Sequence, residues 1–172
     1  MKLTLKLVLM LAIITFLTTG VALAQPEFSG SGTLTVFANV INSCSVNSTE
    51  LIFDGYRPAT QNAYSPLDSQ TEIMWTCTNG TEATITLGLG QFDLEGNPDF
   101  PNRTMTNGSD HLQYSLYQDP NRFNVWGATE LSGVKVEGNG GTQWATIYGR
   151  IPAGQNVPSG FYQDSVVISM IY

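Results

Sequence analysis

The sequence predicts an all-β antiparallel sandwich. Many short segments alternate apolar and polar residues, the period of two that is typical of half-buried strands. Gly, Asn, Asp and Pro residues separate these segments at short intervals, as turns do. Beyond residue 24, no segment sustains the apolar spacing of about 3.6 that a helix requires. Short strands joined by frequent turns indicate an antiparallel sandwich.

The first 24 residues have the features of an export signal. Lys2 and Lys6 precede a short apolar run at 7–17, and the Ala-Leu-Ala sequence at 22–24 fits a cleavage site. The run is shorter than the ~20 residues of a membrane span. We therefore expect a signal peptide at 1–24 and an exported protein that begins at Gln25, with the length of one domain.

The charge of the mature chain argues against nucleic-acid binding. Removal of Lys2 and Lys6 changes the net charge from −7 to about −9. The remaining basic residues form no cluster along the sequence. Because nucleic-acid binding requires a basic surface that neutralises phosphates, nucleic acid is not an expected partner.

The two cysteines, Cys44 and Cys77, are expected to form one disulfide. An even number of cysteines behind an export signal favours pairing in an oxidising compartment. The alternatives are two free thiols or a metal site, and the single histidine makes the metal site the poorer of these.

The first half of the mature chain is expected to contain a long loop at 57–68 and several strands. Asp54-Gly55 marks the end of one short strand. Asn79-Gly80 predicts a tight hairpin turn, since both residues tolerate positive φ. The strands are expected at 33–41, 51–53, 71–78 and 84–89.

The second half is expected to contain long loops at 90–109 and 151–160. In the segment 111–117, Leu112, Tyr114 and Leu116 alternate with polar residues and are expected to face the core. The strands are expected at 103–105, 111–117, 123–126, 142–150 and 164–172.

The last segment, 164–172, is apolar on almost both faces. One face carries Val166, Ile168, Met170 and Tyr172, and the other carries Val167 and Ile171. Such a strand is expected to have sheet neighbours on both edges. Because the sequence ends at Tyr172, we expect one of these neighbours to come from another molecule.

The N-terminal segment is a candidate for that missing strand. Leu34, Val36, Ala38 and Val40 share one face, and the preceding Ser-Gly sequence leaves the segment free to extend. The residues alone leave two interpretations open. The segment is either an ordinary first strand of its own domain or a strand donated to the next molecule.

No catalytic or metal site is expected. Ser109, Asp110 and His111 are adjacent in sequence, so their side chains diverge on an extended chain and cannot form a triad. His111 is expected to be a surface residue. The acidic residues Asp93, Glu95 and Asp99 are candidate calcium ligands, but their spacing fits no calcium loop and a solvated loop is the simpler interpretation.

The tryptophans allow a second hypothesis for function. Trp75, Trp126 and Trp144 are expected either to pack in the core or to form an aromatic surface that stacks on sugars. The second option corresponds to an exported monomeric sandwich that binds carbohydrate, or to a coat or matrix protein of the same fold.

Several motifs follow one another in a fixed order along the mature chain. The first are Cys44-Ser-Val46, then Leu51-Ile-Phe-Asp-Gly-Tyr56 and the stretch around Cys77. The most specific are Tyr148-Gly-Arg-Ile-Pro-Ala-Gly-Gln155 and Pro158-Ser-Gly-Phe-Tyr-Gln-Asp164, followed by a terminal strand that ends in an aromatic residue. In this order the motifs resemble the spore coat protein U domain family, which includes the pilins of archaic (Csu-type) chaperone–usher pili. The resemblance covers nearly the whole mature chain.

The resemblance implies an incomplete immunoglobulin-like antiparallel sandwich that lacks its final strand. It implies a donor strand within an extension at 25–43 and a sandwich domain at 44–172. The donor residues are Leu34, Val36, Ala38 and Val40, and the strand that borders the acceptor groove carries Val166, Ile168, Met170 and Tyr172.

The resemblance also implies the partners and the location of the protein. The implied partners are a periplasmic pilus chaperone, an outer-membrane usher and neighbouring pilin subunits in a head-to-tail polymer. The protein would pass through the periplasm to a surface pilus that supports adhesion and biofilm formation. No enzymatic activity and no cofactor are expected. The position of the subunit in the fibre, shaft or adaptor, stays open.

Overall fold

The structure is a computed structural model that describes residues 29–47, 49–93 and 96–172. The expected signal peptide, 1–24, lies outside the described residues. No helix in the described part of the chain is long and apolar enough to cross a membrane. Residues 39–172 form one compact unit, and the described residues of the preceding unit, 29–38, have no regular secondary structure.

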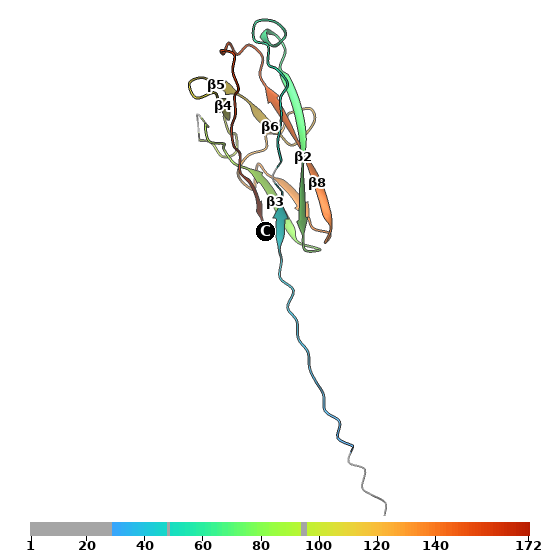
Figure 1. Cartoon of the computed structure of the whole chain (residues 1–172). Coiled ribbons are helices and arrows are strands. Elements are labelled where there is room, and N and C mark those ends of the chain that lie inside the picture. Colours follow the sequence, from blue (N-terminus) through green and yellow to red (C-terminus); the bar gives the residue numbers. More distant parts are fainter. Residues whose placement is uncertain (1–28, 48, 94–95) are drawn as a thin grey trace, which may run out of the picture. The chain divides into compact units, whose positions relative to one another are not determined.

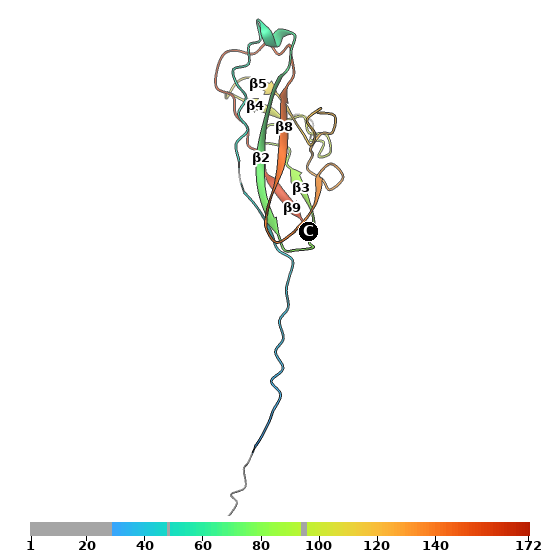
Figure 2. The same ribbon diagram turned by 90° about the vertical axis from the view of Figure 1, so that its right-hand side faces the viewer.

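One face of the sandwich is a four-stranded antiparallel sheet with the order β1-β2-β8-β6. Its strands are β1 (Cys44–Val46), β2 (Leu67–Cys77), β8 (Thr142–Ile151) and β6 (Ser115–Tyr117). The ladder between β2 and β8 extends from Leu67↔Ile151 to Thr76↔Thr142, and the two strands lie side by side in Figures 1 and 2. This long ladder explains why β2 begins before the predicted segment 71–78.

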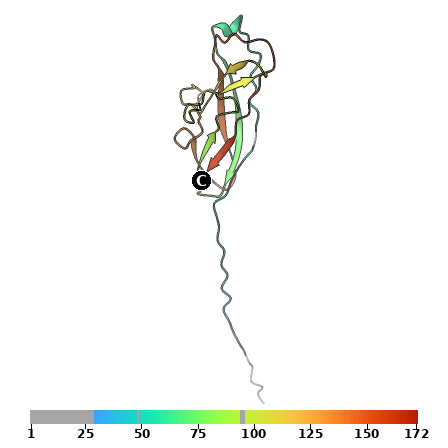
Figure 3. The ribbon, with the colours of Figure 1, turned by 90° about the vertical axis from the view of Figure 1, so that its left-hand side faces the viewer.

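The second face is a three-stranded antiparallel sheet with the order β7-β3-β9. Its strands are β7 (Val134–Glu137), β3 (Glu82–Leu87) and β9 (Ile168–Ile171), and Figure 3 shows β3 and β9 side by side. β4 (Thr104–Thr106) and β5 (His111–Gln113) form a separate pair, and a short 3₁₀ helix, η1, covers Gln61–Ala63. In the described part of the chain β9 pairs with β3 alone, so no strand is hydrogen-bonded to its other edge.

The core lies between the two sheets. β2 contributes Ile73 and Trp75, and β3 contributes Ile85 and Leu87. Trp126 is also fully buried, and its indole N–H donates to the Ile85 carbonyl at 2.8 Å. The other buried apolar side chains are Cys77, Ala83, Leu112, Tyr114, Leu116, Ile147 and Ile151.

Cys44 and Cys77 form a disulfide, as the sequence predicts. The two residues are opposite each other in the ladder between β1 and β2. The disulfide therefore joins the first strand covalently to the centre of the domain.

The predicted hairpin at Asn79-Gly80 is wrong. The residues do form a tight turn, in which Gly80 has φ 76° and the Thr81 N–H donates to the Thr78 carbonyl. However, the turn connects β2 to β3, which belong to different sheets. The Gly80 N–H donates to the Gly138 carbonyl in the turn after β7, so the two turns are hydrogen-bonded to each other. Each of these turns takes the chain from one sheet to the other.

Two predicted strands, 51–53 and 123–126, are not regular strands in the structure, although Val125 forms an isolated antiparallel bridge with Tyr117. Residues 51–53 form no backbone ladder. In the second segment, the Asp119 carboxylate accepts from the N–H groups of Phe123 and Asn124, which holds this part in a turn. The strand β7 was not predicted.

The predicted strand 111–117 is divided into β5 and β6. The Tyr114 N–H donates to the Arg103 carbonyl at 3.0 Å, so the chain changes partner there from β4 to β8. The predicted core face is nevertheless correct, because Leu112, Tyr114 and Leu116 are all buried. The predicted last strand, 164–172, is regular only over β9.

Candidate functional site

An apolar groove of about 810 Å³ lies within the unit 39–172. Its flanks are two segments without regular strand structure, 49–56 and 157–166, and Ile168 of β9 continues the second flank. Side chains from several core strands form its floor: Leu87, Met105, Leu112, Tyr114, Leu116, Ile147 and Ile151. The two flanks converge towards β1 and β9, which contact each other.

The first flank, residues 49–56, continues from β1 alongside β2. Only side chains connect it to β2. The Ser69 hydroxyl donates to the Ile52 carbonyl at 2.6 Å, and the hydroxyls of Thr49 and Thr71 lie 3.2 Å apart. Among the described residues, the main chain of 49–56 forms no backbone–backbone hydrogen bond. Apart from the carbonyls of Ile52 and Gly55, which accept from side chains, this flank therefore presents N–H and C=O groups without a partner among the described residues.

A glycine in β8 makes room for the first flank. Leu51 and Phe53 are half-buried, while Ile52 between them is exposed. A Cβ atom at Gly149 would lie 2.6 Å from Leu51 Cδ2 and 2.7 Å from Phe53 Cζ. Gly149 thus lets the first flank pack closely on the inner face of the four-stranded sheet.

The second flank, residues 157–166, is bonded along one edge only. Gln163 exchanges two backbone hydrogen bonds with Thr106, and the Gly88 N–H donates to Val167 at 2.8 Å. Among the described residues, the main-chain groups of Tyr162, Asp164 and Val166 have no backbone partner. Because alternate residues of an extended chain direct these groups to opposite edges, the unpaired groups face away from β3 and β4.

The floor of the groove contains one polar contact. The Tyr114 hydroxyl donates to Asp164 Oδ2 at 2.7 Å, and the Gln91 N–H donates to Asp164 Oδ1 at 2.9 Å. Burial raises the pKa of Tyr114, and the hydrogen bond to Asp164 raises it further, so the phenol stays protonated. The contact fixes the second flank to the floor.

Tyr56 and Asn62 link the far ends of the two flanks. The Tyr56 hydroxyl donates to the Pro152 carbonyl at 2.8 Å and accepts from the Gln155 N–H at 3.0 Å. Asn62 is buried, and it accepts from the N–H groups of Arg57 and Gly154. These bonds position the start of the second flank relative to the end of the first.

A buried arginine supports the structure beside the groove. Arg103 has no exposed surface, and its guanidinium donates to the carbonyls of Gly88, Leu87 and Trp126 at 2.7–3.0 Å. Burial lowers the pKa of Arg103 to about 10, so it remains charged at neutral pH. The side chain thus connects the end of β3 to the start of β4 and to the loop that contains Trp126. The end of β3 also holds the second flank, because the Gly88 N–H donates to the Val167 carbonyl.

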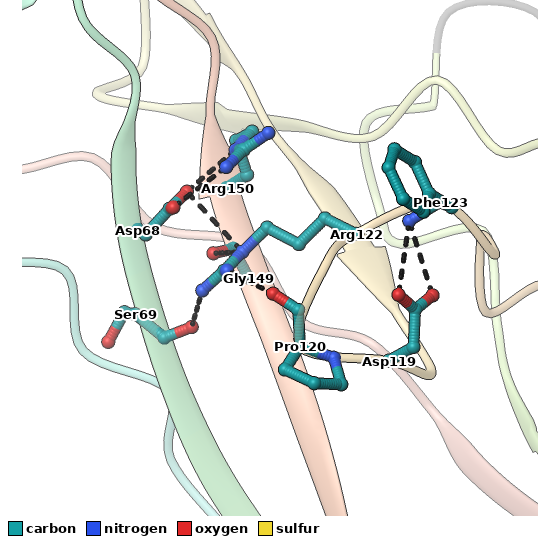
Figure 4. Close-up of polar contacts among 8 residues, drawn as sticks. All are labelled: Asp68, Ser69, Asp119, Pro120, Arg122, Phe123, Gly149 and Arg150. Carbon is teal, nitrogen blue, oxygen red and sulfur yellow. Dashed lines mark hydrogen bonds and ion pairs between the residues drawn. The ribbon is translucent and has the colours of Figure 1, made fainter.

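The outer face of the four-stranded sheet carries an ion-pair cluster (Figure 4). Arg150 binds Asp68 through two hydrogen bonds of 2.7 and 2.8 Å, and Arg122 Nε lies 3.3 Å from the same carboxylate. The hydrogen bonds from Arg150 lower the pKa of Asp68. Arg122, at φ 61°, also donates to Gly149 and Ser69, so the cluster connects β2, β8 and the loop after β6.

The expected acceptor-strand residues divide into two groups. Val166 and Ile168 line the groove, and both pack against the core. Met170 packs against the core outside the groove lining, and Tyr172 is exposed.

The expected donor residues Leu34, Val36, Ala38 and Val40 are all exposed. Phe37 and Ile41, which occupy the opposite face of the same segment, are exposed as well. Residues 33–41 have no strand partner among the described residues.

The sequence reasoning missed the first flank and the beginning of the second. Leu51 and Phe53 were assigned to an ordinary strand, and Val157 and Tyr162 to a loop and an irregular stretch. The signal that identifies Leu51, Phe53 and Tyr162 is positional, because these three residues lie within the motifs 51–56 and 158–164 that carry the family resemblance.

The other sequence candidates do not converge into a site. His111 is exposed, as expected. Trp75 and Trp126 are buried and Trp144 is exposed, so the three tryptophans do not share one surface. Asp93 and Asp99 belong to no group of three or more potential metal ligands among the described residues, and Glu95 lies outside them.

Comparison with known proteins identifies the family. The Spore Coat Protein U domain matches residues 31–169, which is most of the chain. The chain belongs to the Spore Coat Protein U domain family. A relative in this family, Protein U of Myxococcus xanthus, is 35% identical over 153 residues, which cover 84% of this chain and 86% of Protein U.

A solved structure shares the fold of this family member. It is the crystal structure of the CsuC–CsuE chaperone–tip adhesion subunit pre-assembly complex from archaic chaperone–usher Csu pili of Acinetobacter baumannii. One of its chains matches with a TM-score of 0.57 and 19% identity over 77% of the present chain, which spans 40% of that chain. The predicted immunoglobulin-like all-β sandwich is confirmed.

Proposed function

We propose that this protein is a structural subunit of a surface pilus that the chaperone–usher pathway assembles by donor-strand exchange. The observation that carries the proposal is the apolar groove of about 810 Å³ between two flanks with unpaired main-chain groups. A strand placed there would form hydrogen bonds with both flanks and would cover the apolar floor.

The strand that fits the groove is residues 33–41 of another copy. Leu34, Val36, Ala38 and Val40 would face the floor, and burial of this face would contribute on the order of 5–8 kcal/mol at ~1.5–3 kcal/mol per large side chain. Ladder hydrogen bonds would add about 0.5–1.5 kcal/mol each. Because the donor and acceptor surfaces of one copy are different, this contact does not close on itself and propagates a filament.

The remaining partners follow from this assignment. Before assembly, a periplasmic chaperone would fill the groove with a strand of its own, and an outer-membrane usher would exchange it for the next subunit. Membership of the Spore Coat Protein U domain family supports these partners, as does the fold shared with a chain of a chaperone–pilus subunit complex. The export signal at 1–24 supports passage to the periplasm and then to the cell surface, where the pilus would serve adhesion and biofilm formation.

Substitution of Val36 in the mature chain tests the proposal. Val36→Asp is expected to abolish head-to-tail oligomers, because an unpaired carboxylate would enter an apolar groove. Oligomer size is measured by native mass spectrometry. Ser31→Asp is the matched control, since it adds the same charge outside residues 33–41, and it should still assemble. Oligomers of Val36→Asp that match the wild type would contradict the proposal.

A further inference from the structure

The outer face of the proposed donor strand carries two large apolar residues, Phe37 and Ile41, among the polar residues Thr33, Thr35 and Asn39. When Leu34, Val36, Ala38 and Val40 face the groove floor, the alternation of an extended chain directs Phe37 to the outside. Phe37 is 88% exposed in the structure. A strand that needed only its inner face would carry a polar residue at position 37, as it does at the outer positions 33, 35 and 39.

The rim of the groove carries matching apolar side chains. Ile52, on the first flank, is 70% exposed, and Phe161, on the second, is 81% exposed, yet both belong to the groove lining. Each projects outward beside inward-facing neighbours, Leu51 and Tyr162. The two flanks thus place one large apolar side chain each on the outer edge of the space that a strand would occupy.

The charge of the rim favours residues 33–41 as the occupant. The groove lining includes the carboxylates of Glu50, Asp54 and Asp164, and the mature chain as a whole is acidic. The segment 28–49 contains no charged residue and is the longest such stretch of the mature chain. It can therefore enter the groove without repulsion from these carboxylates.

We propose that a second copy of this chain is recognised on both faces of its donor strand, and that Phe37 packs on the rim residues Ile52 and Phe161. This inference rests on the proposed donor-strand exchange. Phe37 is then a specificity-determining residue. A polar residue at this position still allows insertion, but the strand loses the cross-strand contacts on the outer face that slow its release.

A labelled peptide tests donor-strand exchange and the outer-face contact of Phe37 separately. The acceptor is the full mature chain with Val36→Asp in its own N-terminal segment, so that it offers a groove but does not polymerise. The probe is a fluorescent peptide of residues 33–41, and fluorescence anisotropy gives its Kd and dissociation rate. We expect Phe37→Ser in the peptide to raise the Kd about tenfold, mainly through faster dissociation.

The acceptor side supplies the matched controls. Either acceptor substitution, Ile52→Ser or Phe161→Ser, should weaken binding of the wild-type peptide. Neither should weaken binding of the Phe37→Ser peptide much further. Leu131→Ser is the control, since Leu131 is 92% exposed and lies outside the groove lining, and it should leave binding unchanged.

The outcomes separate this inference from the proposed function. Equal affinity of the wild-type and Phe37→Ser peptides, with no binding of a Val36→Asp peptide, would overturn the outer-face contact and leave donor-strand exchange intact. Failure of the wild-type peptide to bind would overturn the proposed function and this inference with it.

Discussion

Replacing Arg103 by methionine is expected to lower the free energy of unfolding by about 3–5 kcal/mol. Methionine keeps most of the buried aliphatic volume but removes the donors to the carbonyls of Leu87, Gly88 and Trp126. Buried carbonyl groups that lose a partner each cost about 1–3 kcal/mol. The loss is partly offset because the buried guanidinium charge is no longer desolvated.

Urea unfolding, followed by tryptophan fluorescence, measures the effect of Arg103→Met. Arg57→Met is the matched control, since Arg57 is exposed and, among the described residues, its side chain donates only to the Gly55 carbonyl at 3.3 Å. The control should change stability by less than about 0.5 kcal/mol. An Arg103→Met protein as stable as the control would show that the buried arginine does not support β3 and the groove.

Removal of the disulfide is expected to have an effect of similar size. Cys44 and Cys77 are separated by 33 positions, and the chain-entropy relation gives about 3–4 kcal/mol for a loop of that length. A double Cys44→Ala, Cys77→Ala variant should therefore unfold at a lower urea concentration than the wild type. Wild-type protein unfolded under reducing conditions should behave in the same way.

The disulfide should also matter for the groove. It anchors β1 to β2 immediately before the first flank, whose own main chain has no backbone ladder among the described residues. The double variant should therefore bind the peptide of residues 33–41 less tightly than the oxidised protein. Unchanged stability and unchanged peptide binding would contradict the role assigned to this disulfide.

The sequence predicted side-chain burial better than strand pairing. The alternation of Leu112, Tyr114 and Leu116 identified a core face correctly, although the chain changes partner at Tyr114. Burial depends on the local period of two, which is visible in the residues. Pairing depends on distant residues such as the Arg103 carbonyl, and turn chemistry at Asn79-Gly80 does not specify which sheet the next strand joins.

The groove was only partly predictable for the same reason. The apolar character of Val166 and Ile168 identified one border from the sequence, and both residues line the groove. The opposite border, with Leu51 and Phe53, looks like an ordinary short strand in the sequence. This segment borders the groove because its main chain forms no ladder with β2 and because Gly149 leaves room for Leu51 and Phe53. No local sequence pattern predicts either feature.

Thermal unfolding of the mature Val36→Asp chain, with and without the wild-type peptide of residues 33–41, tests the central claim most directly. At a peptide concentration of about 100 times Kd, the account predicts a rise in Tm of about 10 °C. A peptide that itself carries Val36→Asp should give no rise. An acceptor whose Tm is the same with either peptide would show that the groove is not a site for this strand, and would contradict assembly by donor-strand exchange.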